Sequence, residues 1–432
     1  MKNTFKGFNY EKVPLPIRRF LNSCISFRFS YPYKKLKIIG VTGTSGKTTT
    51  TTLLYRIAIE LGHKAGLIGT VENFIAGEKI TADFYKKGLG SIWEKIFFSS
   101  TGTTPEVWEL NKLLSKMTSV GCEYVFMEVS SHGLEEKRVS RLKFTGAIFT
   151  NLSHDHLDFH KNMENYFQSK RKLFTMLSDD SFALANSDSE YGNKILQDTN
   201  ARRYTYGFTM NENFHGAVQK LDFNGLELSF NQTEVKSKLL GQFNSYNLLS
   251  VWSACKLLGF DMKKVQGILQ NITPPTGRFD HFMSPTGILV VIDYAHKPDA
   301  LLNVLNTIRE IKEKDGKIIS VFGCGGDRDP SKRPKMGRIG VALSDIPIFT
   351  SDNPRSEDPN KIIADMIAEL YPADIQKVKL ITDRREAIKE AVRLANRGDV
   401  ILCAGKGHED YQEIKGVKNH FNDMEELKRA FQ

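Results

Sequence analysis

The chain of 432 residues is long enough for two or three domains with separate cores, and its 40% hydrophobic and 25% charged residues are typical of a globular protein. The net charge of +10 is concentrated in residues 1–37, which carry nine Lys and Arg against Glu11 alone; the remaining 51 basic and 49 acidic side chains nearly cancel, which argues against a nucleic-acid partner. The five cysteines form no C-x-x-C pair, and no apolar run approaches the roughly 18 residues of a membrane span. We therefore expect a cytoplasmic protein with neither a disulfide framework nor a zinc site.

Residues 1–36 form a short basic segment that we expect to pack as an arm on the first domain. The segment also carries apolar and aromatic side chains, including Phe20, Phe27, Phe29 and Tyr31. This mixture is equally compatible with a short amphipathic element resting on an anionic membrane surface, so both readings stay open.

A glycine-rich loop follows the first predicted strand, Leu36 to Val41, and precedes a predicted helix over 47–61. Its glycines, Gly43 and Gly46, let backbone N–H groups approach an anion, Lys47 adds a positive charge, and the Thr48 hydroxyl can ligate magnesium. The expected ligand is ATP or GTP. The loop departs from G-x-x-x-x-G-K-[ST] only in its first glycine, which falls at Gly40, one residue earlier than the motif requires.

Two further clusters follow predicted strands, 124–129 and 147–150, and both should lie at the same sheet edge as the loop. The first contains Glu128 within Phe126 to Leu134, and the second contains His156 within Thr150 to Asp158. A nucleotide-bound magnesium takes only one or two protein carboxylates and keeps several waters. Glu128 and His156 are therefore candidate metal ligands.

The remaining pattern alternates short β-branched runs with helical stretches, which favours an α/β fold with mainly parallel sheets. Strands are also predicted at 288–294, 318–322, 346–350, 378–381 and 400–404, and helices at 162–177, 299–311, 361–370 and 384–395. Residues 203–240 alternate like strands and indicate a small antiparallel insertion. A Pro-Pro-Thr-Gly sequence at 274–277 marks a boundary, so we predict a central domain over 37–275 and a C-terminal domain over 276–432.

Three loops of the C-terminal domain concentrate charged residues after predicted strands. They are Val321 to Asp329 with Lys332-Arg333-Pro334, then Ser351-Asp352-Asn353-Pro354-Arg355, and finally Ala404-Gly405-Lys406-Gly407-His408-Glu409-Asp410. Arginines at 333 and 355 can clamp a carboxylate, while Glu409 and the backbone at Gly405 can receive an ammonium group. Without further information, Arg355 could equally form a surface ion pair with acidic residues at 357 or 358.

The order of these motifs, together with Asn244-x-x-Asn247, Gly277-Arg278 and Asp293-Tyr294-Ala295-His296, resembles the Mur ligase family over residues 37–432. Within that family the chain is similar to the UDP-N-acetylmuramoyl-tripeptide synthetases of the MurE type. The resemblance implies a P-loop ATPase domain followed by a Rossmann-like domain, in an enzyme that joins an amino acid to a peptide carboxylate while ATP becomes ADP and phosphate. We expect this enzyme to be a monomer. It implies meso-diaminopimelate as the amino acid, because Asp-Asn-Pro-Arg marks the members that select it over lysine.

The resemblance also implies a role for each matching residue. ATP would contact Gly43, Thr44, Ser45, Gly46, Lys47, Thr48, Thr49, Asn247, Arg278 and Asp293, with Lys47 on the phosphates, Asn247 on the adenine and Asp293 on the ribose. The metal and catalytic residues would be Lys47, Thr48, Glu128, His156 and Lys170, the last of them carbamylated. The muramoyl peptide would meet Thr103, Thr104, Ser130 and Arg138, and the amino acid Arg333, Asp352, Asn353, Pro354, Arg355, Gly405 and Glu409. Read without the family, Lys170 is an ordinary solvated helix lysine.

One departure leaves the acceptor open. Members of the family carry an N-terminal domain that grips the uridine nucleotide, whereas about 36 residues precede the first strand here, too few for an independent core. His154 and Lys297 are milder departures, since this type has arginine and threonine there. Two alternatives follow: an amide ligase with a nucleotide-free acceptor, similar to folylpolyglutamate synthetases, and a nucleotide-binding scaffold that has lost catalysis. The presence of four candidate catalytic residues opposes the scaffold: Lys47, Glu128, His156 and Lys170.

Overall fold

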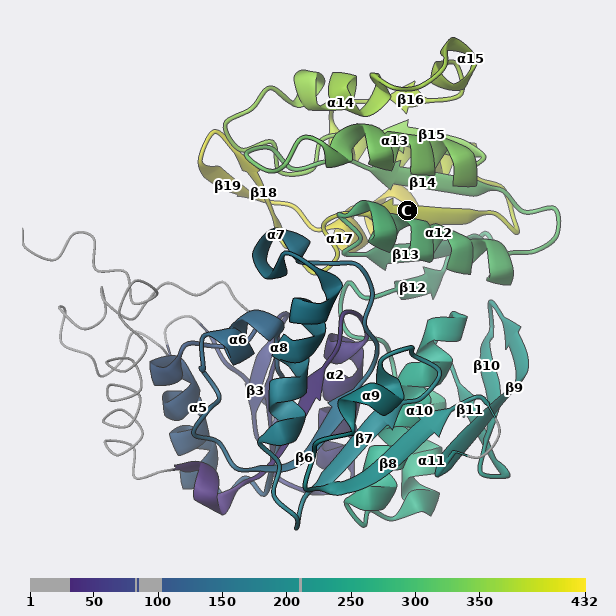
Figure 1. Cartoon of the computed structure of the whole chain (residues 1–432). Coiled ribbons are helices and arrows are strands. Elements are labelled where there is room, and N and C mark those ends of the chain that lie inside the picture. Colours follow the sequence, from purple (N-terminus) through teal and green to yellow (C-terminus); the bar gives the residue numbers. More distant parts are fainter. Residues whose placement is uncertain (1–31, 82–83, 85–102, 210–211) are drawn as a thin grey trace, which may run out of the picture. The chain divides into compact units, whose positions relative to one another are not determined.

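The computed structural model describes residues 32–81, 84, 103–209 and 212–432 (Figure 1). The basic segment predicted over 1–36, with its aromatic side chains, lies outside the described residues except for the short 3-10 helix η2 (Pro32–Lys35). Internal contacts divide the chain into two compact units, the first ending at Asn271 and the second beginning at Ile272. Two short segments, 219–227 and 237–242, group with the second unit, because Leu221, Phe223 and Leu240 pack against its core.

An 11-stranded sheet organises the first unit. Its spatial order is β11-β10-β9-β8-β7-β6-β1-β5-β2-β3-β4, and the pairs from β2 through β5, β1, β6, β7 and β8 to β9 are parallel. The strands are β1 (Lys37–Thr42), β2 (Ala65–Ile68), β3 (Asn73–Ile75), β4 (Glu78–Lys79), β5 (Tyr124–Glu128), β6 (Phe144–Phe149), β7 (Phe182–Asn186), β8 (Arg202–Gly207), β9 (Phe214–Asp222), β10 (Gly225–Phe230) and β11 (Thr233–Ser237). Because β1 lies between β5 and β6 with all three parallel, their carboxyl ends meet at one sheet edge.

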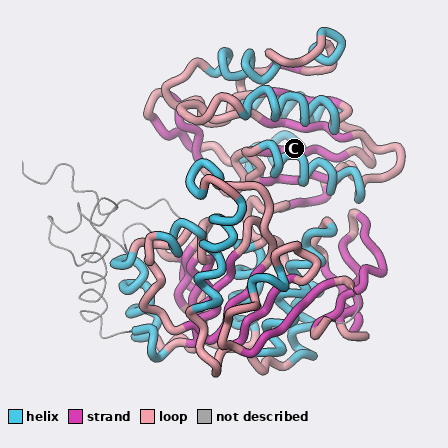
Figure 2. The backbone as a smooth tube through the Cα atoms, viewed as in Figure 1, coloured by secondary structure: helices cyan, strands magenta, loops and turns pink. Residues whose placement is uncertain are grey.

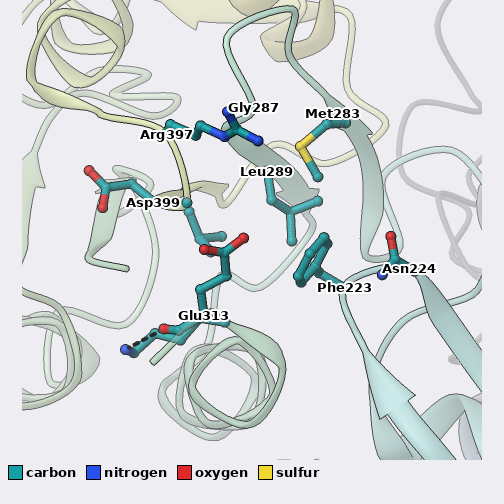
Figure 3. A pocket seen from close by; sticks show the side chains of 11 residues that line it. Phe223, Asn224, Met283, Gly287, Leu289, Glu313, Arg397 and Asp399 are labelled. Carbon is teal, nitrogen blue, oxygen red and sulfur yellow. Dashed lines mark hydrogen bonds between the residues drawn. The ribbon is translucent and has the colours of Figure 1, made fainter. Parts of the chain in front are cut away.

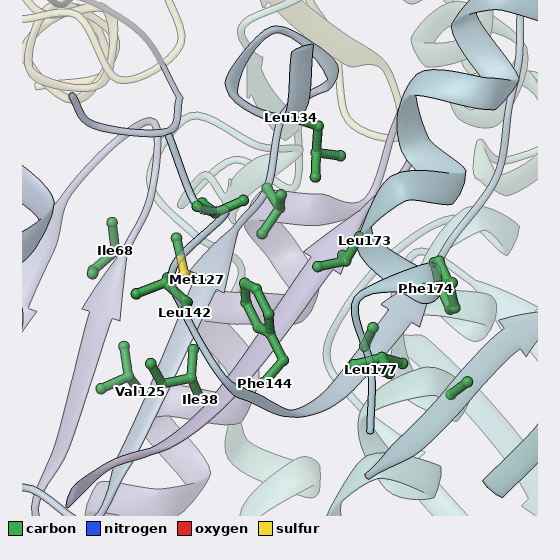
Figure 4. Packing of buried hydrophobic residues seen from close by; sticks show 14 of the residues in the cluster. Ile38, Ile68, Val125, Met127, Leu134, Leu142, Phe144, Leu173, Phe174 and Leu177 are labelled. Atoms are coloured by element: carbon green, nitrogen blue, oxygen red, sulfur yellow. The ribbon is translucent and has the colours of Figure 1, made fainter. Parts of the chain in front are cut away.

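Helices cover both faces of this sheet (Figure 2). One face packs against α5 (Val107–Ser119) and α8 (Met163–Thr175) in a core that includes Ile38, Val125, Phe144 and Phe174 (Figure 4). On the other face lie α2 (Lys47–Glu60), α10 (Gln242–Leu257) and α11 (Met262–Asn271), with a hydrogen bond between the Thr50 and Ser250 hydroxyls. The shorter helices are α6 (Ser131–Glu135), α7 (Leu157–His160) and α9 (Gly192–Ile195).

Residues 202–237 form strands, as their alternation predicts, but the pair β8–β9 is parallel, whereas the sequence indicated a small antiparallel insertion. These strands, β8 to β11, extend the main sheet, and β8 is parallel to both β7 and β9. Alternation of side chains determines which face each residue occupies but not which strand becomes the neighbour. Pairing is decided by burial against the rest of the unit.

The second unit is a six-stranded sheet between two layers of helices. Its order is β12-β13-β17-β14-β15-β16, parallel except for the edge pair β12–β13. The strands are β12 (Asp280–Met283), β13 (Leu289–Asp293), β14 (Ile318–Phe322), β15 (Ile346–Phe349), β16 (Lys379–Leu380) and β17 (Val400–Ala404), followed by the hairpin β18 (Tyr411–Ile414) and β19 (Val417–His420).

Alternate residues of each strand in this sheet face opposite helical layers. In β13, Leu289 and Val291 pack with α12 (Pro298–Ile311), α13 (Lys332–Leu343) and α14 (Pro359–Ile367), whereas Val290 and Ile292 pack with α16 (Arg384–Leu394) and α17 (Asp423–Ala430). The unit also contains the short helix α15 (Pro372–Ile375). Burial on both faces explains the continuous apolar runs that predicted these strands.

The strands predicted from apolar runs and the five predicted helices are confirmed, with ends that differ by a few residues. The α/β class with mainly parallel sheets is likewise confirmed. None of the helices in the described ranges is long and apolar enough to cross a membrane.

Candidate active site

The glycine-rich loop connects β1 to α2 and has a shape that only glycine permits at two positions. Gly46 adopts φ +84°, and a Cβ there would lie 2.5 Å from Asn247 Oδ1. A Cβ on Gly43 would lie 1.9 Å from Thr150 Oγ1. Because helix α2 begins at Lys47, the loop presents the helix N-terminus, where backbone N–H groups and the helix dipole favour an anion. The cradle therefore fits a phosphate group.

The segment after β6 holds this loop in place through hydrogen bonds. The backbone N–H of Thr44 donates to Asn151 O (2.9 Å), that of Ser45 donates to Asn151 Oδ1 (3.0 Å), and the Thr150 hydroxyl donates to Ser45 O (2.6 Å). Thr48 and Thr49 lie in the first turn of α2. The residues at 150–153 thus hold the backbone of the phosphate loop in its conformation.

Two lysine amines converge on the carbonyl oxygen of Gly43. Lys47 Nζ donates to it over 2.8 Å and also to Thr44 O (2.9 Å), while Lys170 Nζ, from α8, donates over 2.8 Å. Lys170 is only 1% exposed, with its amine 4.5 Å from the centre of the Tyr166 ring. Burial, and then the neighbouring charge of Lys47, lower the pKa of Lys170 well below its usual value. The reading of Lys170 as a solvated helix lysine is wrong, because its side chain is buried beside the phosphate loop.

Glu128 ends strand β5 at the same sheet edge as the phosphate loop. Its buried carboxylate accepts hydrogen bonds from the backbone N–H and the hydroxyl of Thr70, both over 2.9 Å. A Cβ on Gly69 would lie 2.9 Å from Glu128 Oε1, so the glycine leaves room for the carboxylate. Glu128 is a fixed anion within the parallel β1–β5 pair, where Val41 is its register partner.

His156 lies beyond β6 at φ +53°, with its Nε2 3.3 Å from Asp155 Oδ2 and its ring 5.0 Å from that of His132. Among the described residues, no group of three or more His, Cys, Asp or Glu side chains is close enough to hold a metal ion. A cation here would thus depend on few protein ligands of mixed type. The hydroxyl of Thr48 and the carboxylate of Glu128 are the hard oxygen donors that magnesium prefers.

The residues predicted to hold the peptide acceptor form one network beside Glu128. The Thr104 hydroxyl donates to Glu128 O (3.1 Å) and contacts the Ser130 hydroxyl (3.1 Å), while the Thr103 hydroxyl accepts from Thr70 (3.1 Å). Ser130 Oγ also caps α6 by accepting from the N–H of Gly133.

Arg138, the fourth predicted acceptor residue, is engaged by protein groups. It donates to Thr104 O (2.7 Å) and forms ion pairs with Glu106 (2.7 Å) and Glu136. Its side chain therefore orients Thr104. Glu136 lies two residues away in the sequence, but nothing around residue 138 indicated the pairing with Glu106.

In the second unit, Asp293 and Arg278 lie at the end of β13. The carboxylate of Asp293 accepts from the N–H of Phe279 (2.7 Å), and burial raises its pKa although Arg278 opposes the shift. The Arg278 guanidinium stands over the Tyr294 ring at 5.1 Å. A Cβ on Gly277, at φ +68°, would lie 2.1 Å from the backbone nitrogen of His408, so only glycine fits there.

The Asp352–Arg355 segment follows β15 and meets the loop after β17. Asn353 Nδ2 donates to Glu409 Oε2 (2.7 Å), and a Cβ on Gly405, at φ +113°, would lie 3.6 Å from Asp352 Oδ2. Arg355, at φ +51°, donates from Nη1 to Gly326 O (2.7 Å). Ionic groups of both signs are thus gathered at the carboxyl end of this sheet.

Arg333 does not join this cluster through its charge. It is 2% exposed, and its two terminal nitrogens donate to Glu357 Oε1 and Asp365 Oδ2, each over 2.8 Å. Arg328, which the sequence reasoning did not select, is exposed and belongs to the loop after β14. A Cβ on Gly325 would lie 3.0 Å from Arg355 Nη1 and 3.9 Å from Arg328 Cγ, so both arginines flank the same glycine. Membership of the Gly-Gly-Asp-Arg loop was the signal that could have identified Arg328.

A cavity of about 290 Å³ lies elsewhere in the second unit (Figure 3). Leu289 and Val400, at the starts of β13 and β17, line it together with Phe223, Met283 and Arg397. Since Asp293 and Ala404 end these same strands, the cavity lies at the opposite sheet edge from the cluster described above. It does not belong to the candidate site.

Comparison with known proteins gives matches along most of the chain. Residues 41–255 match the Mur ligase middle domain, and residues 277–407 match the Mur ligase glutamate ligase domain. A protein of Parabacteroides distasonis named UDP-N-acetylmuramoyl-L-alanyl-D-glutamate--2,6-diaminopimelate ligase is 47% identical over 411 residues, which cover 95% of this chain and 81% of that protein.

Solved structures that resemble this chain include ligases of the same kind. A ligase of the same name is 32% identical with a TM-score of 0.67, over 94% of this chain and 81% of that one. A Mycobacterium tuberculosis folylpolyglutamate synthase complexed with ADP reaches a TM-score of 0.71 over 92% and 93% of the two chains. Its identity of 18% makes this a likeness of fold alone.

Proposed function

The chain belongs to the Mur ligase family, and from this premise we propose that it joins meso-diaminopimelate to UDP-N-acetylmuramoyl-L-alanyl-D-glutamate at the expense of ATP, a step of peptidoglycan precursor synthesis. One observation carries the proposal: a lysine amine, 1% exposed, lies 2.8 Å from the carbonyl oxygen of Gly43 in a phosphate-binding loop. A buried amine beside a phosphate-binding loop suits phosphoryl transfer, in which several charged groups must be held in fixed positions. The relatives named for this reaction support the choice of substrates.

The reaction must first activate a carboxylate, which is a poor electrophile for an amine. A carboxylate oxygen of the acceptor attacks the γ-phosphorus of ATP, the bond to the bridging oxygen breaks, and ADP leaves. The acyl phosphate that results is attacked at its carbonyl carbon by the neutral amine of the amino acid. Phosphate then leaves, the nitrogen loses a proton, and an amide remains. Positioning and charge neutralisation dominate such chemistry.

Within the first unit, we assign the phosphates to the loop Gly43 to Gly46 and to Lys47. When ATP binds, the Lys47 side chain would rotate, and its amine would exchange the carbonyl oxygens of Gly43 and Thr44 for phosphate oxygens. Thr48 and Glu128 would hold magnesium, with His156 supporting a second ion, and the metal would neutralise charge on the transferring group. Asn247, whose Oδ1 faces Gly46, would contact the adenine.

We further propose that Lys170 acts as a carbamate. The lowered pKa favours the neutral form of its amine, and a neutral amine nitrogen can attack the carbon of carbon dioxide, lose a proton and become an anionic group. This converts a like charge beside Lys47 into an opposite one. The carbamate would then supply oxygen ligands for a metal, which an ammonium group does not.

The acceptor peptide is assigned to Thr103, Thr104 and Ser130, next to Glu128, with Arg138 orienting Thr104 rather than contacting substrate. In the second unit, Arg278 would meet phosphate and Asp293 the ribose hydroxyls. This unit, proposed as the amino-acid-binding domain over 276–432, follows the proposed ATP-binding domain over 37–275.

We assign the carboxylates of diaminopimelate to Arg355 and to exposed Arg328, and its ammonium group to Glu409 and Asp352, with Asn353, Pro354 and Gly405 shaping the site. Arg333 then has a supporting role, since Glu357 and Asp365 occupy its charge. A diamino-dicarboxylic acid needs more anion receptors than lysine does.

Phosphate release tests the function directly. The enzyme is supplied with ATP, magnesium, bicarbonate and UDP-N-acetylmuramoyl-L-alanyl-D-glutamate, and with diaminopimelate, lysine or glutamate in parallel. The proposal expects release that requires both the acceptor and diaminopimelate. Turnover only with an acceptor that lacks the nucleotide would instead favour a ligase similar to folylpolyglutamate synthetases. No release with any amine donor would favour a nucleotide-binding scaffold.

A further inference from the structure

Lys406 is a fully buried lysine at the centre of the charged cluster, and it has no role in the assignments above. It follows β17, and its Nζ donates to Asn353 Oδ1 (3.0 Å) and Tyr411 O (2.6 Å). The same nitrogen lies 3.6 Å from Asp352 Oδ1 and 3.5 Å from Glu409 Oε2. One ammonium group therefore contacts both acidic residues and the amide of the motif.

These contacts determine which way the Asn353 amide points. Its Oδ1 accepts from Lys406 Nζ and from the backbone N–H of Glu413 (2.9 Å), and its Nδ2 faces Glu409 Oε2 (2.7 Å). The opposite orientation would place the amide NH₂ against two donors and its oxygen against a carboxylate. Buried donors left without an acceptor are costly. Lys406 thus fixes one edge of the site.

The buried charges of the cluster do not cancel. Around Lys406, Asp352 and Glu409 contribute two negative charges and Lys406 one positive charge. Lys332 and Arg384 also interact with the charge of Asp352, but Lys332 donates to His296 O and Arg384 is paired with Asp423. Asp352 is 6% exposed, and its Oδ1 accepts no hydrogen bond from any described residue. An uncompensated buried charge is costly, and a cation that enters the cluster relieves it.

We propose that Lys406 is a positioning residue for the amino-acid substrate: it orients the Asn353 amide and leaves the Asp352–Glu409 pair one positive charge short of balance, so that the cluster takes one ammonium group of a diamino acid. This inference rests on the proposed function. It adds to that function the residue, Lys406, whose charge limits the cluster to one cationic group.

The ionisation of Glu409 agrees with this arrangement. Burial, and then the nearby charge of Asp352, raise the pKa of Glu409, whereas Lys406 and the Asn353 hydrogen bond lower it. Burial, and then the charge of Glu409, raise the pKa of the neighbouring Tyr294. Without Lys406 the pKa of Glu409 rises further, so the side chain is protonated over a wider pH range and loses its attraction for an ammonium group.

The test compares Lys406→Met with the wild type and with Lys389→Met, a control that removes an exposed lysine of α16. At neutral pH the KM for diaminopimelate should rise at least about tenfold in Lys406→Met, because the site loses the charged hydrogen bond that orients Asn353 and Glu409 is ionised less often. It should fall again as the pH is raised, because Glu409 then ionises, while the KM for ATP stays unchanged. The control should match the wild type at every pH.

A charge-balance rescue separates this role from a structural one. In Lys406→Met the carboxyl groups of Asp352 and Glu409 lack the cation that they share, so Glu409 is more often protonated. Adding Asp352→Asn removes the neighbouring negative charge and lets Glu409 ionise again, so the double variant should have a lower KM for diaminopimelate than Lys406→Met alone. If Lys406→Met does not fold, Asp352→Asn alone leaves no net charge and should raise that KM without a pH-dependent limb. An unchanged KM in the folded variants, or no rescue, overturns the inference alone. A wild type inactive with diaminopimelate overturns the proposed function and this inference with it.

Discussion

Replacement of Lys170 by alanine removes the buried amine beside the phosphate loop. Both Lys170 Nζ and Lys47 Nζ donate to the same carbonyl oxygen, that of Gly43, over 2.8 Å. The two nitrogens are therefore at most about 5.6 Å apart. If both are cations, they repel one another by about 3 kcal/mol at an effective dielectric constant of about 20.

A carbamate at Lys170 turns this repulsion into an attraction of similar size. Lys170→Ala loses the attraction at the moment when charge moves onto the transferred phosphoryl group. A loss of about 3 kcal/mol in the transition state corresponds to a decrease in kcat of about a hundredfold. Loss of a metal ligand adds to this figure, so a hundredfold is the minimum expected.

The assay is phosphate release at saturating ATP, acceptor and diaminopimelate, with magnesium and bicarbonate. Short carboxylic acids such as acetate should partly restore kcat in Lys170→Ala, because a carboxylate can enter the space left by the side chain, whereas extra bicarbonate should not. Lys172→Ala is the matched control, since Lys172 lies on the same helix but is half-exposed and paired with Glu135. Labelled bicarbonate should also give a carbamate carbon signal in NMR spectra of the wild type that Lys170→Ala lacks.

An undiminished kcat in Lys170→Ala would refute the reasoning. The same conclusion would follow if the wild type and Lys170→Ala gave identical spectra with labelled bicarbonate. A decrease without rescue, but with a carbamate signal in the wild type, would mean that added acids do not reach the buried space.

Three other changes test separate parts of the site. Gly46→Ala should raise the KM for ATP more than Gly62→Ala does, because of these two glycines only Gly46 has a neighbour within 4 Å of an added Cβ. The backbone strain of a positive φ, about 1–2 kcal/mol, is common to both variants. Arg355→Ala should raise the KM for diaminopimelate at least thirtyfold, from a loss of about 2–5 kcal/mol, with little effect on ATP. Arg384→Met should lower the unfolding free energy by about 3–5 kcal/mol in denaturant titrations, because the Asp423 carboxylate, fully buried, loses its partner.

Each of these expectations can fail in a defined way. Equal ATP kinetics in Gly46→Ala and Gly62→Ala would show that the close approach at Gly46 does not matter for nucleotide binding. Proportional KM changes for both substrates in Arg355→Ala would indicate a general folding defect. An Arg384→Met variant as stable as the wild type would mean that Asp423 becomes solvated.

The parallel strands and principal helices could be predicted because burial on both sheet faces leaves continuous apolar runs in the sequence. The candidate site could be located because phosphate loop, Glu128 and the segment after β6 each follow a strand, and parallel strands end at one edge. Pairing of β8 with β9 could not be predicted, since alternation carries no information about the neighbouring strand.

The ion-pair partners of charged side chains could not be predicted from the sequence. Arg333 occurs in a pattern that suggests substrate binding, yet its carboxylate partners come from other segments; Asp365 lies 32 residues from Arg333. Arg138 likewise pairs with Glu106 from another segment, although Glu136 is close in sequence. The burial of Lys170 and of Lys406 was also hidden, because a lysine on a helix or in a loop is solvated by default. Only the fold places these amines among charged neighbours.

The backbone around Arg355 connects the proposed amino-acid site to a second part of the chain. Its N–H donates to Glu413 O (3.0 Å), its carbonyl accepts from Lys415 (2.6 Å), and Gln412 Nε2 donates to Asp352 O (2.7 Å) over a separation of 60 residues. Hairpin β18–β19 thereby completes the motif as a neighbouring strand would. A change in the hairpin would therefore disturb the backbone that holds the left-handed conformation of Arg355, so the motif and the hairpin form one structural unit.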